Sequence, residues 1–321
     1  MGIIPHDHVA SPVAAPKLPS MPALLEATAL AKSFGGTRVV DGVDLACDRA
    51  QVLGVLGPNG AGKTTTLKML YGFLTPEAGT VRYAGRDLAT DREAIKRTIG
   101  VCPQDDTLDA EFDVVGNLRQ MARYFRPRVA DLRVRVDALI DIFGLRAHAK
   151  KLPDQLSGGL RRRLSIARAV VHSPAVLFLD EPTTGLDPEA RVGVWELVAK
   201  LRSEGLAIVL TTHYMDEAER LSDQLLLLKD GKVLSRGTPA ALLGDLMGER
   251  MLVVRPPAEI RAKIIAWMTA ATGAAPANVL DEMRLGLTNA QVGAFCQQFP
   301  DLHPHVRDPD LDDLFLMLAR S

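Results

Sequence analysis

The chain contains the segment Val52-Leu-Gly-Val-Leu-Gly-Pro-Asn-Gly-Ala-Gly-Lys-Thr-Thr65. Its first five residues form an apolar run of strand length, and a helical pattern follows from about Lys63 to Leu70. The glycines let the backbone curl so that several N–H groups point inward, and the start of the helix adds its positive end. The spacing of Gly57, Gly62, Lys63 and Thr64 therefore predicts a loop that binds the phosphates of a nucleotide.

The residues of this loop have separate expected tasks. Lys63 is expected to neutralise the β- and γ-phosphates during catalysis, and the Thr64 hydroxyl is expected to be a ligand of Mg²⁺. On its own this loop indicates an NTPase of some kind, and ATP with Mg²⁺ is the nucleotide that we expect the chain to bind and hydrolyse. The predicted nucleotide contacts here are Gly57, Pro58, Asn59, Gly60, Ala61, Gly62, Lys63, Thr64 and Thr65.

Two acidic residues follow a second apolar run, Val176-Leu-Phe-Leu-Asp180-Glu181. In an open α/β sheet, ligands bind at the carboxyl ends of the strands, so both acids are expected beside the phosphate loop. Asp180 is predicted to hold Mg²⁺ through its water shell, and Glu181 to polarise the attacking water as a general base. Two adjacent carboxylates would repel each other, and a divalent cation relieves this repulsion.

Short apolar runs alternate with helical patterns, as in α/β proteins with a largely parallel sheet. The further expected strands cover residues 24–29, 43–46, 79–83, 99–102, 206–211 and 251–254. Helices are expected over 114–124, 131–143 and 258–271, in a final apolar segment at 311–318, and after Ser157, which is expected to cap a helix. Residues 223–234 are expected to form a hairpin with its turn at Asp230-Gly231.

Three parts are expected along the chain. Residues 1–22 contain five prolines and no basic start followed by an apolar block, so we expect a disordered leader and no signal peptide. Residues 23–243 are expected to form the main domain, with a helical subdomain over about 105–165. Residues 244–321 are expected to form a small accessory region.

Four further features complete an ordered set of motifs. Gln104 follows the apolar run 99–102, and Leu156-Ser157-Gly158-Gly159 opens the helix that leads to Asp180. Asp187 lies in Gly185-Leu-Asp-Pro188, and His213 follows the next expected strand. Over residues 24–240 the chain therefore resembles the nucleotide-binding subunits of ABC transporters. The resemblance implies a P-loop NTPase fold with a RecA-like core, an antiparallel β-subdomain, a helical signature subdomain and the accessory region.

The resemblance also implies roles for individual residues. Phe34 resembles the aromatic residue that stacks on adenine, although a core Phe is the alternative and the family more often has Tyr. Gln104 resembles the residue that touches Mg²⁺ and the attacking water, and His213 the switch that contacts the γ-phosphate and orients Glu181. The catalytic set is thus Glu181, His213, Gln104 and Lys63, and the metal set is Thr64, Gln104 and Asp180.

A second copy of the chain is implied as a partner. In the family, the segment Leu156, Ser157, Gly158 and Gly159 binds the ATP held by another subunit in a head-to-tail dimer, and Asp187 links the two copies. The usual Gln after the glycines is Leu160 here. Arg161, Arg162 and Arg163 follow, either as phosphate ligands or as a solvated helix face.

The segment Val101–Phe112 and the later Arg123-Tyr-Phe125 resemble the ATPases of lipo-oligosaccharide (nodulation-factor) exporters, and more loosely those of daunorubicin-type drug exporters. Such ATPases work with a separate membrane permease, whose cytoplasmic helix is received by the helical subdomain. Leu108, Phe112, Val114 and Leu118 either line that groove or pack in an ordinary helical core. The substrate is not specified by the sequence, because the permease selects it.

Composition limits the partners and the compartment. No apolar run approaches the ~18 residues needed to span a bilayer. The net charge of −1, from 38 basic and 39 acidic residues, gives no electrostatic reason to expect nucleic acid as a partner. Three isolated cysteines and no CxxC pair favour a reducing compartment. We therefore expect a cytoplasmic protein bound peripherally to the inner face of the cell membrane through its permease.

Two alternatives to an exporter ATPase remain. An importer ATPase would carry the same motifs, and a neighbouring gene for a periplasmic binding protein would favour it. A soluble ABC ATPase of DNA repair or translation usually has tandem domains or a long coiled coil, whereas this chain has one motif set and no heptad run.

Overall fold

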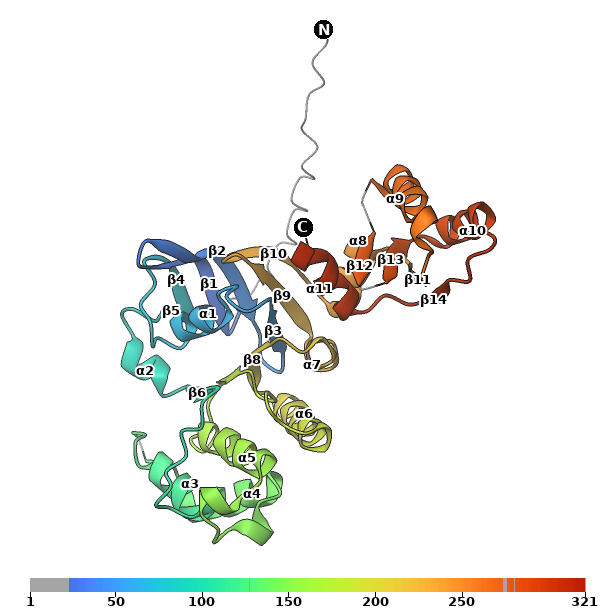
Figure 1. Ribbon diagram of the computed structural model, residues 1–321. Helices are drawn as coiled ribbons and strands as arrows, with labels where there is room; N and C mark the ends of the chain where they lie inside the picture. Colours follow the sequence, from blue (N-terminus) through green and yellow to red (C-terminus); the bar gives the residue numbers. More distant parts are fainter. Residues whose placement is uncertain (1–22, 127, 274–275, 280, 321) are drawn as a thin grey trace.

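The computed structural model describes residues 23–126, 128–273, 276–279 and 281–320. These residues form three sheets joined by helices, and the last sheet belongs to a separate C-terminal unit (Figure 1). The alternation of strands and helices confirms the expected α/β class.

The first sheet is antiparallel and has the order β2-β1-β4-β5. Its strands are β1 (Leu25–Phe34), β2 (Thr37–Cys47), β4 (Ala78–Tyr83) and β5 (Arg86–Asp87). β1 and β2 are longer than the sequence predicts because Gly35 and Gly36, both with positive φ, turn the chain directly from one into the other. The short helix α2 (Arg92–Lys96) follows β5.

The second sheet is the centre of the molecule and has the order β10-β9-β3-β8-β7-β6. Its strands are β3 (Val52–Leu56), β6 (Ile99–Cys102), β7 (Val176–Asp180), β8 (Ala207–Thr212), β9 (Gln224–Lys229) and β10 (Lys232–Gly237). All neighbours pair in parallel except β9 and β10, which form the expected hairpin. The carboxyl ends of β3, β7 and β8 therefore meet at one edge of the sheet.

The two faces of the central sheet have different covers. Phe178 of β7 packs in a core with Leu67 and Leu70 of α1 (Lys63–Leu70) and with the antiparallel sheet. Leu177 and Leu179 point the other way, into a core formed with α5 (Gly158–Ala169) and α6 (Pro188–Ser203). This alternation explains why the strand is a continuous apolar run, because both of its faces are buried.

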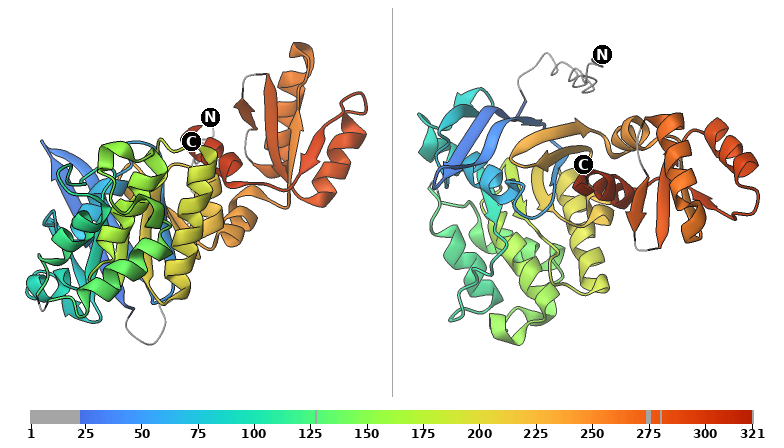
Figure 2. Two further views of the ribbon diagram at one scale, coloured as in Figure 1. Left: turned by 90° about the horizontal axis from the view of Figure 1, so that it is seen from below. Right: turned by 45° about the horizontal axis from the view of Figure 1, so that its top comes forward.

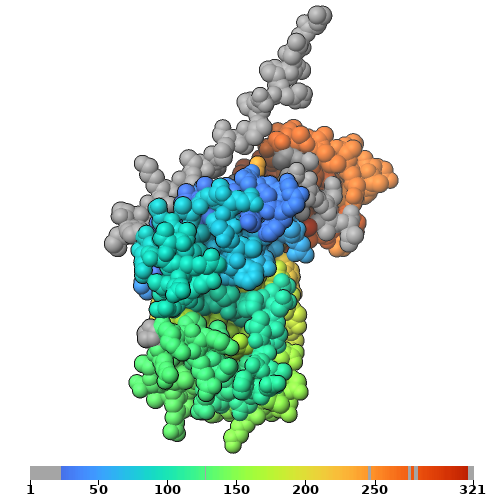
Figure 3. Space-filling view, turned by 90° about the vertical axis from the view of Figure 1, so that its left-hand side faces the viewer, coloured from blue at the N-terminus to red at the C-terminus, as the bar shows by residue number. Residues whose placement is uncertain are grey.

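A helical part lies beside the central sheet, and its helices bury apolar side chains against one another. It contains α3 (Val114–Ala122), α4 (Leu132–Ile142), the short 3₁₀ turns η1 (Arg146–His148) and η2 (Pro153–Gln155), and α5. Figure 3 shows it (green) below the antiparallel sheet (blue to teal). Val114 and Leu118 have no exposed surface, so these two residues belong to the core and line no groove.

The C-terminal unit follows α7 (Met215–Leu221), the β9–β10 hairpin and α8 (Pro239–Met247), a helix that spans the expected start of the accessory region. The elements of the unit are β11 (Arg250–Val254), α9 (Ala258–Thr272), β12 (Ala277–Val279), β13 (Glu282–Leu287), α10 (Asn289–Gln298) and β14 (His305–Arg307). The sheet order β12-β13-β11-β14 and the βαββαβ succession give a ferredoxin-like unit at one end of the molecule (Figure 2). Leu252 and Leu285 pack with Phe295 on its helix-covered face.

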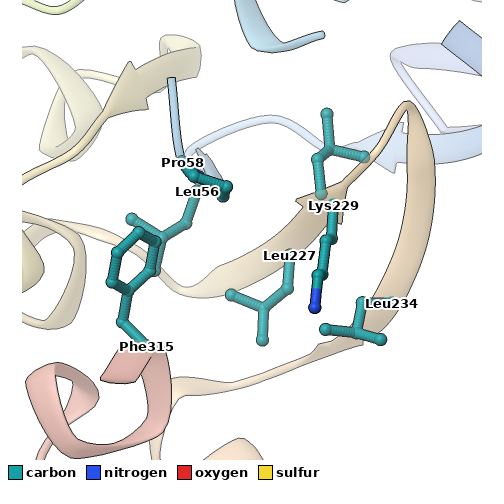
Figure 4. Close-up of a pocket in the computed structure, with 8 residues that line it drawn as sticks. Leu56, Pro58, Leu227, Lys229, Leu234 and Phe315 are labelled. Carbon is teal, nitrogen blue, oxygen red and sulfur yellow. The ribbon is translucent and has the colours of Figure 1, made fainter. Parts of the chain in front are cut away.

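The last helix, α11 (Leu311–Arg320), returns from this unit to the main domain, where it contacts α7 and α8. Leu311 and Leu314 are buried in a core shared with Met215 of α7 and Met251 of β11. Figure 4 shows Phe315 beside Leu56 and Pro58, on the side of the phosphate loop that faces the hairpin. α11 therefore joins the accessory unit to the strand that carries this loop.

A buried ion pair holds α11 to the accessory sheet. The Asp313 carboxylate, 1% exposed, accepts from Arg284 of β13 at 2.9 Å and from Arg307 of β14 at 2.6 and 2.8 Å. Its Oδ2 also accepts from the backbone N–H of Asp310. The hydrogen-bond donors to this carboxylate thus come from the accessory sheet and from Asp310, which directly precedes α11.

Throughout the described ranges, helices are too short or too polar to cross a lipid bilayer.

Replacement of Asp313 by alanine should weaken this attachment. Arg284 and Arg307 would lose the carboxylate between them, which typically costs about 3 kcal/mol for a buried pair. Urea unfolding should show this loss, and hydrogen exchange should increase most in α11 and β14. Asp312→Ala is the matched control, because Asp312 is exposed. Equal hydrogen exchange of α11 in both variants would show that the ion pairs of Asp313 do not hold this helix.

His172 makes stability depend on pH. Its ring stacks on Phe125 with 3.6 Å between the ring centroids, and its Nε2–H donates to the carbonyl oxygen of Ile99 at 3.0 Å. Burial lowers its pKa from 6.5 to about 4. The unfolded chain therefore binds a proton between these values that the folded chain does not, so stability falls as the pH falls from 6.5 towards 4.

Comparison with His172→Gln isolates this effect. The free energy of unfolding of the native chain, relative to that of the variant, should fall by about 2 kcal/mol between pH 7.5 and pH 5.0. Urea titrations at both pH values measure it. A difference between the two proteins that is the same at both pH values would contradict a depressed pKa at His172.

Candidate functional site

The loop between β3 and α1 can form only with glycine at several positions. Gly60 and Gly62 have φ values of 84° and 96°, which L side chains rarely adopt. A Cβ at Gly62 would lie 2.6 Å from the carbonyl oxygen of Val39, and one at Gly57 would lie 2.3 Å from that of Leu228. The loop is thus held close to two neighbouring segments, with Gly60 open to the outside.

Lys63 is the first residue of α1 and is largely buried. Its Nζ donates to the carbonyl oxygens of Gly57 at 2.8 Å and Pro58 at 3.1 Å, so the side chain folds back along the loop. Burial lowers the pKa of Lys63, and the nearby Glu181 and Asp180 oppose this shift. The ammonium group is thus fixed inside the curve of the loop, where an anion would neutralise it.

Asp180 joins the ends of three neighbouring strands. Its Oδ1 accepts from Thr64, which follows β3, at 3.1 Å, and from Thr211 of β8 at 2.5 Å. Asp180 itself ends β7 and is 5% exposed. The carboxylate therefore brings the phosphate loop and two strand ends into one polar cluster.

Glu181 lies next to this cluster, and three side chains contact its Oε2. Gln104 donates at 3.3 Å and Thr184 at 3.0 Å, while Nδ1 of His213 lies 3.2 Å away. The last pair is close enough for an ion pair, but its angles do not meet those of a hydrogen bond. The backbone of Glu181 has φ 45°, a conformation that costs a non-glycine residue energy and is concentrated at functional sites.

One open pocket of about 530 Å³ unites these residues. Its lining residues come from β2, from the loop and the start of α1, and from the segments that follow β6, β7 and β8: Val39, Asn59, Gly60, Gly62, Lys63, Thr64, Thr65, Gln104, Glu181, Thr184 and His213. The structure therefore brings Lys63, Gln104, Glu181 and His213 together from four segments, as the motifs predict.

Other predicted residues lie outside this lining. Ser157 caps α5 by accepting from the N–H of Leu160, and Asp187 caps α6 by accepting from that of Ala190. Ser157, Gly158 and Gly159 begin α5 beside a neighbouring hollow, whereas Leu156 is buried in the core. Phe34 ends β1 and is 48% exposed, so the alternative of a core Phe is wrong.

The structure adds residues that sequence reasoning missed. Glu217 of α7 is fully buried and accepts from Thr183 at 2.9 Å and from Trp195 of α6 at 3.1 Å. Burial raises the pKa of Glu217. No motif or spacing in the sequence distinguishes Glu217, because its partners Thr183 and Trp195 are distant along the chain.

The donor set fits Mg²⁺ bound together with a phosphate ligand. Within the described part of the chain, no three His, Cys, Asp or Glu side chains are grouped to hold a metal by themselves. Thr64 lines the pocket, and its hydroxyl and the buried Asp180 carboxylate are hard oxygen donors 3.1 Å apart. Mg²⁺ usually takes one or two such protein oxygens, and phosphate oxygens and water complete its shell.

Comparisons with known proteins identify one family. Residues 40–184 match the family model of the ABC transporter. The chain is 42% identical over 238 residues to the Nod factor export ATP-binding protein I of Cupriavidus pinatubonensis. The aligned residues make up 74% of this chain and 73% of that protein.

Two solved structures share the fold. The ATP-binding subunit of an ABC transporter superposes with a TM-score of 0.63 at 29% identity, over 70% of this chain and 93% of the other. A dimeric bacterial ABC transporter cassette gives a TM-score of 0.61 at 26% identity, over 67% and 98%. Because it has the phosphate loop, the acidic pair, the matching family model and 42% identity to the Cupriavidus protein, the chain belongs to the family of ABC transporter ATPases.

Proposed function

We propose that this chain hydrolyses ATP with Mg²⁺ in order to drive export through a separate membrane permease. The observation that carries the proposal is the position of Glu181. Its carboxylate faces the same pocket as Lys63 and Thr64 and contacts Gln104, Thr184 and His213. A carboxylate so placed can accept a proton from water beside the terminal phosphate.

The loop residues are proposed to bind the phosphates. The curved backbone of residues 57–62 offers N–H groups, α1 adds its positive end, and Lys63 supplies a fixed charge. Phe34 is exposed enough to stack on adenine, and Lys32 lies 5.8 Å from its ring centroid. Thr64, Asp180 and Gln104 would hold Mg²⁺, which neutralises the charge that develops on the phosphates.

The hydrolytic step is assigned to side chains that meet at one carboxylate oxygen. Glu181 is proposed to take the proton of the attacking water, while Gln104 and His213 orient that carboxylate from opposite segments of the chain. The strained backbone of Glu181 is fixed by its N–H, which donates to Thr211. This arrangement limits the directions in which the carboxylate can point before the nucleotide arrives.

A second copy is proposed to complete each site. Ser157, Gly158 and Gly159 do not line the pocket of their own chain, and Ser157 and Gly158 are exposed at the start of α5. A helix start with exposed N–H groups is suited to bind an anion. The related bacterial cassette is described as dimeric, which supports a head-to-tail pair in which these residues reach the partner's ATP.

The permease is proposed to dock in a groove of about 240 Å³ between the central sheet and the helical part. Its lining is largely apolar and includes Phe73, Val101, Met121 and Phe125, with Lys96 at its edge. Phe73 is 68% exposed beside this apolar lining, so a partner that covered it would bury apolar surface. Docking here would place the chain on the cytoplasmic face of the membrane.

The substrate class is proposed from the relatives. The Cupriavidus protein is named for the export of Nod factor, so a lipo-oligosaccharide or a related polysaccharide or drug-like molecule is the proposed cargo. Co-purification of a membrane permease with the tagged chain, followed by substrate-stimulated ATP hydrolysis in proteoliposomes, tests this assignment. Stimulation by a periplasmic binding protein would indicate import.

Lys63→Ala should abolish ATP hydrolysis. The variant loses the charge that faces the phosphates, and phosphate release from the purified chain should fall by at least 100-fold, which corresponds to about 2.7 kcal/mol of transition-state stabilisation. Lys68→Ala, on the same helix but outside the pocket lining, is the matched control. Hydrolysis by Lys63→Ala at the rate of the control would refute the role of the loop.

Glu181→Gln should retain ATP binding and lose hydrolysis, because the amide cannot act as a base. The variant should accumulate as an ATP-bound dimer, and size-exclusion chromatography with light scattering would detect the doubled mass. Addition of Ser157→Arg, which blocks the start of α5, should return it to a monomer. A Glu181→Gln chain that stays monomeric with saturating ATP and Mg²⁺ would contradict the two-copy site.

A further inference from the structure

Arg162 of α5 makes hydrogen bonds to three separate backbone carbonyl oxygens. Its Nη1 donates to Pro103 at 2.6 Å, its Nη2 to Asp180 at 2.9 Å and its Nε to Pro182 at 2.8 Å. Each nitrogen of the guanidinium therefore has a backbone partner. These three bonds exclude the interpretation of Arg162 as part of a solvated helix face. They also occupy all of its guanidinium nitrogens, so the side chain is not directed at a phosphate.

The three carbonyl groups surround the catalytic residues. Pro103 directly precedes Gln104, and Asp180 and Pro182 stand on either side of Glu181. Glu181 has the left-handed φ of 45°, so its backbone would relax if its neighbours were not held. One side chain thus fixes the two segments whose side chains meet at Gln104 Nε2 and Glu181 Oε2.

The neighbouring arginines make different contacts. Arg161 donates to the carbonyl oxygen of Leu156 at 3.3 Å and lies 3.7 Å from Asp106. Arg163 packs on α6, where its Nη2 would lie 2.1 Å from a Cβ at Gly193. Among these three consecutive arginines, Arg162 is therefore the one bonded to the backbone beside both Gln104 and Glu181.

The same helix begins at the segment proposed to meet the second copy. Ser157 caps α5, and Arg162 lies little more than one turn further along it. Gly158 and Arg162 line one hollow of about 220 Å³ together with Gln104 and Glu181. The helix thus presents its start to the outside and its Arg162 side chain to the backbone beneath the pocket.

We propose that Arg162 is a positioning residue for hydrolysis, which fixes the backbone of Gln104 and Glu181 to the helix that begins at Ser157. The proposal rests on the proposed function, in which Glu181 is the base and Ser157–Gly159 face the partner's ATP. A shift of α5 on contact with the partner's nucleotide would reach Gln104 and Glu181 of the same chain through these three hydrogen bonds.

Arg162→Lys tests the role while keeping the charge. A lysine has one nitrogen on a flexible stem and cannot replace a planar fork that serves three carbonyl groups. Arg135→Lys is the matched control, because Arg135 also donates to two backbone carbonyl oxygens, Val170 and Val171, at the far end of α5. Arg135 is likewise partly buried, and it does not line the nucleotide pocket.

The measurements separate positioning from binding and from folding. Arg162→Lys should lower kcat and the single-turnover rate at least tenfold, while KM and the Kd of a fluorescent ATP analogue stay within twofold. Arg135→Lys should keep kcat within twofold at a similar loss in Tm. An Arg162→Lys kcat within twofold of the native value, or a loss of analogue binding that accounts for the whole defect, overturns the proposal.

A second experiment distinguishes this proposal from the two-copy site. Added to Glu181→Gln, Arg162→Lys should leave the ATP-dependent dimer intact, because the phosphate loop and Ser157–Gly159 are unchanged. Loss of the dimer would show that Arg162 acts on assembly, against the proposal. If Glu181→Gln alone does not dimerise, the two-copy part of the proposed function fails, while the single-turnover comparison still decides whether Arg162 positions Gln104 and Glu181.

Discussion

The carboxylate of Asp180 is the point on which the architecture of the site depends. A single oxygen accepts from Thr64 at 3.1 Å and from Thr211 at 2.5 Å, so two hydrogen bonds join the ends of three adjacent strands. Such charge-assisted bonds are stronger in a largely buried position than in water. The parallel order β3-β8-β7 makes the arrangement possible, because it places all three strand ends at one edge.

Local sequence was enough to predict the parts of the fold that have a single strong pattern. Residues 52–56, 99–102 and 63–70 have the predicted bounds, since continuous apolar runs of strand length need burial on both faces and the glycine loop marks the start of the helix. The helices α2 and α6 and the short strands β5, β12 and β14 were not predicted. The elements α7, α8, β13 and α10 also escaped prediction. Their apolar residues contact α11 or the accessory helices, so their pattern makes sense only once those distant elements are in place.

The residues of the candidate site also divide into those that a local motif predicts and those that only the fold brings into place. Lys63, Thr64, Asp180 and Glu181 belong to motifs whose spacing reflects local geometry, and they meet in the structure as the motifs predict. Arg162 and Glu217 have no such spacing. Arg162 bonds to carbonyl groups 18, 20 and 59 positions away, and Glu217 to side chains 22 and 34 positions away. An arginine among three arginines, or a glutamate in an acidic helix, cannot be distinguished before the chain has folded.

Two faces of α7 pack against other parts of the chain, so this helix lies between the C-terminal unit and the catalytic turn. Glu217 ties one face to Thr183 beside the catalytic turn, and Met215 packs with Leu311 and Leu314 of α11 on the other. A molecule that favours one placement of α11 on α7, and thereby shifts Thr183 through α7, would change the affinity for ATP. By linkage, ATP changes the affinity for that molecule by the same factor. Through α11, the ferredoxin-like unit thus contacts a helix that also contacts the catalytic turn, which is the arrangement that such coupling requires.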